Sequence, residues 1–165
     1  MERAIDMAQH IFERYKLVSG GNIIDEMKLH KLLYFTQRES IAVTGKPMFP
    51  EKFFGWKYGP VCKNVRLCYS ADGMVSDDIR PVSNESAYIA DSIVAQYGGY
   101  ESWKLSELSH KEISWRNARK GLSLNQNGDR TILLKDIRKD AAKVRPYDPV
   151  YDMYYDEFED AEGSV

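Results

Sequence analysis

The sequence contains few of the residues that build disulfide scaffolds, metal centres or membrane spans. Among its 165 residues only two are cysteines, Cys62 and Cys68, and three are histidines. Two cysteines exclude the disulfide framework of a small secreted domain, and no His or Cys spacing matches a zinc site. No apolar stretch approaches the roughly 18 residues of a membrane span, and the N-terminus shows no signal-peptide pattern. We therefore expect a cytoplasmic protein that uses no metal and no cofactor.

The charges are distributed unevenly along the chain, although the net charge is only −2. Residues 110–145 carry ten Lys and Arg against four acids, and residues 146–165 carry seven acids with no Lys or Arg. A hydrophobic fraction of 43% supplies one core, as expected for a chain of this length. We therefore predict one domain over residues 1–145 and an acidic, aromatic tail over residues 146–165.

Hydrophobic periodicity and breaker residues predict a mainly α-helical fold. The pattern indicates a compact bundle of five to seven helices with at most a small two-stranded β element. On the central predicted helix, Lys28, Lys31 and Arg38 are expected to face solvent. Short strands are predicted within residues 52–58 and at 131–134, and residues 71–85 read as a loop. The predicted helices are 2–18, 26–43, one that begins at Gly59 and Pro60, 86–97, 102–109, 113–120 and 135–144.

Motifs for phosphate binding and nucleophilic catalysis are not matched. Residues 44–47 contain a Gly-Lys pair, but the upstream glycine and the following hydroxyl residue of a phosphate loop are missing. No Gly-x-Ser-x-Gly elbow occurs, and neither cysteine has a histidine beside it in the sequence. We therefore expect that the protein is not an enzyme.

The acidic tail carries an aromatic stripe at helical spacing. Tyr151, Tyr154, Tyr155 and Phe158 follow the pattern i, i+3, i+4 and i+7, with carboxylates between them. As a helix, this segment could lie in a groove of a basic partner, with its aromatic rings as anchors. It could equally dock on the basic residues 110–145 of its own domain, or remain disordered.

The basic residues 110–145 allow a second interpretation, a nucleic-acid-binding regulator. Lys and Arg neutralise phosphates, and Trp103 or Trp115 could stack on bases. The acidic tail would compete with phosphate for such a surface. Nucleic acid is therefore the less favoured partner.

Four segments in order along the chain carry specific motifs. Residues 28–34 read Lys-Leu-His-Lys-Leu-Leu-Tyr, residues 44–47 Thr-Gly-Lys-Pro, residues 55–61 Gly-Trp-Lys-Tyr-Gly-Pro-Val, and residues 105–110 Leu-Ser-Glu-Leu-Ser-His, followed by Trp115. Together they resemble the Panacea domain, the SocA-like and GepA-like antitoxin family of bacteria and phages. The resemblance does not extend to residues 146–165.

This resemblance implies an α-helical antitoxin that binds and neutralises a cognate protein toxin, usually encoded beside it. It leaves a second possibility, an adaptor that delivers a toxin or other client to a protease. The family brings no catalytic residues. As a contact platform we predict Trp56, Tyr58, Gly59 and Pro60, because large rings anchor protein interfaces; the alternative is that Trp56 fills the core. The stripe of four aromatic residues in the tail is predicted to join this contact surface.

Overall fold

The central helix of the protein begins and ends at the residues that the sequence indicates. The computed structural model describes residues 1–144. Helix α2 (Glu26–Thr44) begins after Asp25, whose carboxylate accepts the backbone N–H of Lys28 at 2.8 Å. It ends at Gly45, which adopts the left-handed conformation with φ 77°. These caps place a 19-residue helix at the centre of the fold.

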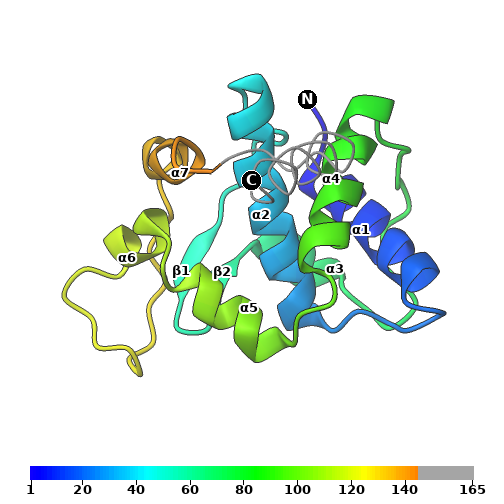
Figure 1. The fold of residues 1–165 in the computed structure, drawn as a ribbon. Coiled ribbons are helices and arrows are strands. Elements are labelled where there is room, and N and C mark those ends of the chain that lie inside the picture. The colour runs from blue at the N-terminus through cyan, green and yellow to red at the C-terminus, as the bar shows by residue number, and fades with distance from the viewer. Residues whose placement is uncertain (145–165) are drawn as a thin grey trace, which may run out of the picture.

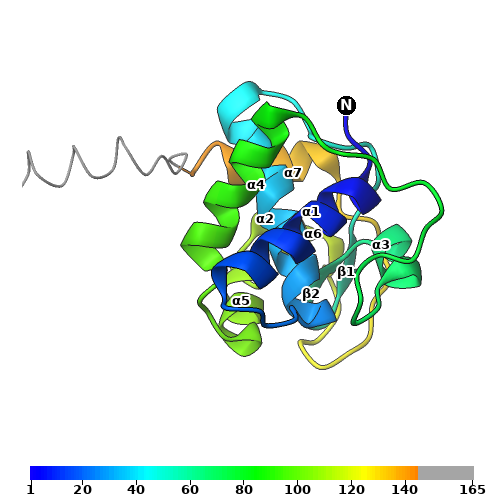
Figure 2. The same cartoon turned by 90° about the vertical axis from the view of Figure 1, so that its right-hand side faces the viewer.

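Other elements surround α2 on several sides. Figure 1 shows α2 between α1 and α4 on one side and α6 and α7 on the other, and Figure 2 shows α1 and α4 together over one side of it. Residues 1–144 contain seven helices and one two-stranded antiparallel sheet, so the prediction of a mainly α-helical fold is confirmed. The remaining elements are α1 (Ala4–Val18), β1 (Phe54–Trp56), β2 (Gly59–Val61), α3 (Lys63–Cys68), α4 (Asn84–Tyr97), α5 (Ser102–Ser109), α6 (Ile113–Ala118) and α7 (Leu134–Ala141).

The prediction that Lys28, Lys31 and Arg38 face solvent is wrong. Helix α2 contacts α1, α4, α5, α7 and β2, and every residue from 28 to 41 is buried. The relative exposure of Lys28 is 8%, that of Lys31 is 2% and that of Arg38 is 5%. The periodicity of one helix does not reveal that neighbours cover all of its faces, so charged residues were assigned to a solvent face that does not exist.

The prediction that Gly59 and Pro60 open a helix is also wrong. These residues belong to β2, which pairs with β1 in the register Gly55↔Pro60 and Trp56↔Gly59. Gly59 has a φ of +128°, a conformation that side-chain-bearing residues rarely adopt and that a helix start excludes. Helix α3 begins four residues later, at Lys63.

The second predicted strand forms only one bridge. Thr131 pairs with Phe54, and the N–H of Ile132 donates to the carbonyl of Phe53 at 2.8 Å. The chain then enters α7 at Leu134, so the segment 131–134 is too short to form a strand of the sheet. The loop predicted at residues 71–85 is confirmed up to Ser83, after which α4 begins.

The predicted tail 146–165 lies outside the described residues. Between residues 1 and 144, none of the helices combines the length and the hydropathy that crossing a bilayer requires.

Candidate functional site

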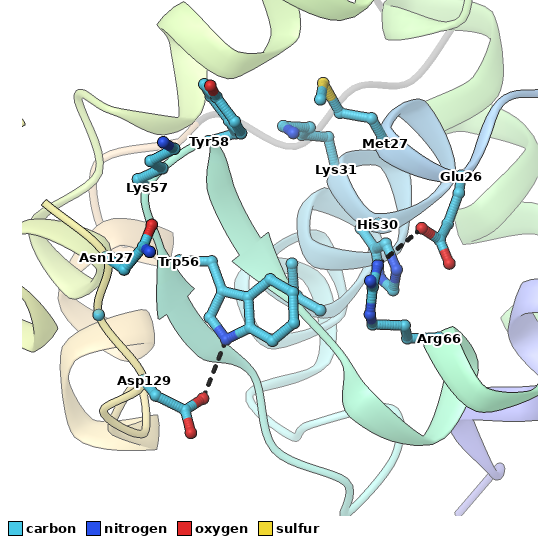
Figure 3. A pocket seen from close by; sticks show the side chains of 12 residues that line it. Glu26, Met27, His30, Lys31, Trp56, Lys57, Tyr58, Arg66, Asn127 and Asp129 are labelled. Atoms are coloured by element: carbon cyan, nitrogen blue, oxygen red, sulfur yellow. Dashed lines mark hydrogen bonds and ion pairs between the residues drawn. The ribbon is translucent and has the colours of Figure 1, made fainter. Parts of the chain in front are cut away.

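A pocket of about 510 Å³ lies beside the β1–β2 hairpin, and Figure 3 shows it from close by. Its wall is formed by the first turns of α2, the hairpin, α3 and the loop 127–129. This volume lies in the range of pockets that hold a small molecule or a protruding side chain. We call it the Lys31 pocket; its lining includes Glu26, His30, Lys31, Trp56, Tyr58 and Asp129.

The structure brings the four predicted hairpin residues together. Trp56 and Tyr58 both line the Lys31 pocket, and 57% of Tyr58 is exposed. Gly59 and Pro60 are buried in β2. The four predicted tail residues, Tyr151, Tyr154, Tyr155 and Phe158, fall outside the part of the chain that the structure describes.

Trp56 is half-buried at the pocket and does not belong to the hydrophobic core. Its indole N–H donates to Oδ1 of Asp129 at 2.9 Å, and Lys63 donates to the other carboxylate oxygen at 3.0 Å. The guanidinium of Arg66 lies 5.1 Å from the centre of the Trp56 ring. Because both contacts hold the ring, Trp56 presents a fixed aromatic wall to the pocket. Figure 3 shows the indole directed toward Asp129.

The side chain of Lys31 packs across the β1–β2 hairpin at Gly59. A Cβ atom on Gly59 would lie 2.9 Å from Cε of Lys31 and 2.8 Å from Oγ of Ser109. Only glycine lets the lysine side chain lie so close to the strand backbone. Three segments that resemble the antitoxin motifs, at residues 28–34, 55–61 and 105–110, therefore meet at this point.

The ammonium of Lys31 is buried without a counter-ion. Its side chain is 2% exposed, and within residues 1–144 no hydrogen bond or ion pair reaches Nζ. Burial lowers the pKa of Lys31 to about 8, although the negative charge of Asp25 partly opposes the shift. At pH 7 the pocket therefore contains an uncompensated positive charge.

His30 lines the pocket and has one buried ring nitrogen without a partner among the described residues. Its Nδ1 accepts the backbone N–H of Cys62 at 3.3 Å, and no described residue partners its buried Nε2. Burial, followed by the charges of Lys31 and Arg66, lowers the pKa of His30 to about 4, so the ring is neutral at pH 7. Because Nδ1 accepts a hydrogen bond, the single ring proton is on Nε2.

A second buried polar cluster lies farther along α2, and its members contact one another. We call it the Tyr34 network; it comprises Tyr34, Arg38, Glu112, Ser114 and Asp140. The Tyr34 hydroxyl lies 2.6 Å from Oγ of Ser114 and donates to Asp140 at 3.2 Å. Arg38 forms a buried ion pair with Glu112. These residues link α2 to α6 and α7, and each charged group has a counter-ion or hydrogen-bond partner, although Nε of Arg38 has none within residues 1–144; this indicates a structural role.

Several cations of the basic segment 110–145 have structural partners. Arg119 is 5% exposed and donates to the carbonyls of Gly55 and Ser123 at 3.0 and 3.1 Å. Arg138 donates to the carbonyl of Gly45 at 2.8 Å. These two cations contribute to the fold, which leaves fewer of them free for phosphate groups.

Sequence reasoning missed Lys31, His30 and Asp129 as site residues. Lys31 and His30 lie within the motif at residues 28–34, but the helical pattern assigned Lys31 to solvent and gave His30 no role. The signal that could have identified Lys31 was its charge, which interrupts an otherwise apolar motif. Asp129 lies 73 residues from Trp56 in sequence, so only the folded chain brings the two together.

Metal binding has no structural support in the described part of the chain. Between residues 1 and 144, no three His, Cys, Asp or Glu side chains gather in an arrangement that could hold an ion.

Comparisons with known proteins point to one family. Residues 29–116 match the family model described as "Antitoxin SocA-like, Panacea domain". A curated relative, "Antitoxin SocA" of Caulobacter vibrioides (strain NA1000 / CB15N), is 40% identical over 50 residues. This match spans 30% of the chain and 27% of the relative's own length. No solved structure matches. Lys31, the hairpin and Ser109 all lie within the matched residues 29–116.

Proposed function

The chain belongs to the SocA-like, Panacea-domain antitoxin family, and from this premise we propose that it neutralises a cognate protein toxin by direct contact. In this proposal the toxin is a protein encoded beside this one, and the two proteins meet in the cytoplasm. The protein acts by covering a toxin surface and performs no catalysis. This proposal is consistent with a chain that has a pocket but contains no phosphate-loop or nucleophile motif.

The observation that carries the proposal is the aromatic hairpin at the mouth of the Lys31 pocket. Tyr58 is 57% exposed beside Trp56, whose ring is fixed by Asp129 and Arg66. Rigid aromatic rings give interface area at low entropic cost and are enriched among residues that dominate binding energy. The hairpin also lies where three motif segments of the family meet.

The acidic tail is proposed as a second contact region. Residues 146–165 carry only negative formal charges, and Tyr151, Tyr154, Tyr155 and Phe158 fall at helical spacing. Acidic aromatic segments complement basic protein surfaces, so we propose that the tail covers a basic region of the toxin.

The test is co-expression with the product of the neighbouring gene. We expect that product to arrest growth when expressed alone and to be harmless with this protein. Tyr58→Ala should weaken rescue and binding by roughly tenfold, as loss of an interface aromatic anchor does. Tyr88→Ala, which removes a similarly exposed tyrosine on α4 (53% exposed), is the matched control and should leave both unchanged.

Two further measurements separate the mechanisms. Deletion of residues 146–165 should weaken rescue if the tail covers the toxin, and unchanged rescue would eliminate that role. A toxin half-life that is unchanged or longer in the presence of the protein supports blocking. A shortened half-life would instead identify a protease adaptor.

A further inference from the structure

The Lys31 pocket contains a buried positive charge that the described part of the protein leaves unpaired. Lys57 also lines the pocket, and its ammonium lies 5.1 Å from the centre of the Tyr58 ring. Each carboxylate of its wall already has a cation: Glu26 pairs with Arg66 at 3.0 Å, and Asp129 accepts Lys63 at 3.0 Å. Within residues 1–144, nothing pairs with the ammonium of Lys31, although its side chain is 2% exposed. A buried charge is unfavourable unless it is paired, so this arrangement favours a partner that supplies the counter-ion.

The remaining wall limits the chemistry of that partner. Trp56, Met27 and Val61 give the pocket apolar surface. A group with one negative charge balances Lys31. In a protein partner, the groups that carry one negative charge at pH 7 are the carboxylates of Asp and Glu. The wall therefore fits a carboxylate attached to an apolar or aromatic group.

We propose that the pocket receives an acidic residue of the toxin, flanked by an apolar or aromatic side chain, with Nζ of Lys31 as its counter-ion. This inference rests on the proposed antitoxin function and names the chemistry by which the same surface selects its partner. In Figure 3 the amine end of Lys31 extends from α2 toward Tyr58, so a bound carboxylate would lie against the aromatic hairpin.

The fold holds this charge in place before a partner arrives. Gly59 provides the space that the Lys31 side chain crosses, with a φ of +128° that other residues rarely adopt. A lysine held in one position loses little further conformational freedom on binding, which favours affinity. The pocket is therefore preorganised for a carboxylate.

The experiment uses the full chain with Lys31→Met. Methionine has a similar length and no charge, so the variant should fold with an equal or higher melting temperature at pH 7. Its Kd for the toxin should nevertheless rise by about tenfold or more, because truncating one partner of a buried charge pair mainly speeds dissociation. Lys111→Met, which removes an exposed lysine that does not line the pocket, is the matched control and should change Kd by less than about threefold.

A double-mutant cycle then identifies the partner residue. Each Asp and Glu of the toxin is changed to Asn or Gln and measured against both the wild type and Lys31→Met. One toxin variant should weaken wild-type binding by about tenfold and have little further effect on Lys31→Met. If no toxin carboxylate couples to Lys31, the inference is wrong.

The outcomes distinguish this inference from the function on which it rests. If the wild type neutralises the toxin and Lys31→Met does so with the same Kd, the carboxylate site is overturned and the antitoxin function stands. If the wild type does not bind the neighbouring gene product, the proposed function itself fails, and the inference with it. If changing tail acids to amides shifts the NMR resonance of the Lys31 ammonium in the free protein, the chain's own tail occupies the pocket, and the toxin is not the partner.

Discussion

Helix α2 carries two groups of buried polar residues, and the two groups differ in whether the buried cation has a counter-ion within residues 1–144. In the Tyr34 network, Arg38 faces Glu112 and also donates to the Tyr97 hydroxyl at 2.9 Å. In the Lys31 pocket, Nζ of Lys31 and Nε2 of His30 have no partner within residues 1–144. A satisfied network fixes the packing of helices, whereas an unsatisfied pocket favours a ligand. On this helix, burial alone therefore does not distinguish structural residues from residues that bind a partner protein. The presence or absence of a counter-ion within the described chain does.

The largest expected effect comes from breaking the satisfied network with Glu112→Ala. The change leaves the guanidinium of Arg38 buried without its carboxylate. Removing one partner of a buried ion pair destabilises proteins by about 3–5 kcal/mol, and we expect a loss in that range. Urea unfolding at pH 7, followed by circular dichroism, measures it.

Glu107→Ala is the matched control for this variant. Glu107 pairs with Lys104 at 3.5 Å on the surface of α5, where 49% of its side chain is exposed. Exposed ion pairs contribute about 0–1 kcal/mol to stability, so this change should have little effect on the free energy of unfolding. A loss of similar size in both variants would show that the Tyr34 network has no special structural role.

The sequence predicted the parts of the fold that local signals determine. Asp25 caps α2 and Gly45 ends it, because capping depends on residues a few positions apart. The environment of Lys31 and Arg38 could not be predicted in this way, since it depends on which elements pack around α2. The prediction that a helix opens at Gly59 and Pro60 was wrong for a related reason. These residues instead pair with β1 and form strand β2.

Part of the candidate site was also predictable. Trp56 and Tyr58 were identified from the concentration of rings in residues 54–58 and from the family resemblance. Lys31 was assigned to solvent because charged residues are usually exposed. Asp129 comes from a loop distant in sequence, and no local pattern connects it with Trp56.

Gly59→Ala should give the second-largest effect, and it acts on the unsatisfied pocket. The new Cβ would lie 2.8 Å from Oγ of Ser109 and 2.9 Å from Cε of Lys31, at a φ of +128°. Backbone strain of this kind costs about 1–3 kcal/mol, and the close contacts place the expected loss near the upper end. Gly99→Ala, where no atom lies within 4 Å of the added Cβ, should change stability by less than about 0.5 kcal/mol. Equal melting temperatures for the two variants would contradict the close packing of Lys31 on β2.

The smallest effect concerns how the charge of Lys31 changes the stability of the free protein with pH. Burial lowers the pKa of Lys31 to about 8 in the folded state, against an ordinary value of 10.5 in the unfolded chain. Between these two values the unfolded chain binds more protons than the folded chain, so the free energy of unfolding rises with pH. We expect the wild type to gain about 2 kcal/mol relative to Lys31→Met between pH 7 and pH 10.

Urea unfolding of both proteins at several pH values measures this gain, because groups that titrate alike in the two proteins cancel in the difference. The nearby His30 and His110 have pKa values lowered by burial, so both rings are neutral throughout this range and do not interfere. A constant difference between the two proteins from pH 7 to pH 10 would mean that the Lys31 ammonium is already paired in the free protein. The contrast between the two polar groups of α2 would then disappear, since both would be satisfied, and the pocket would have no charge left to offer a toxin carboxylate.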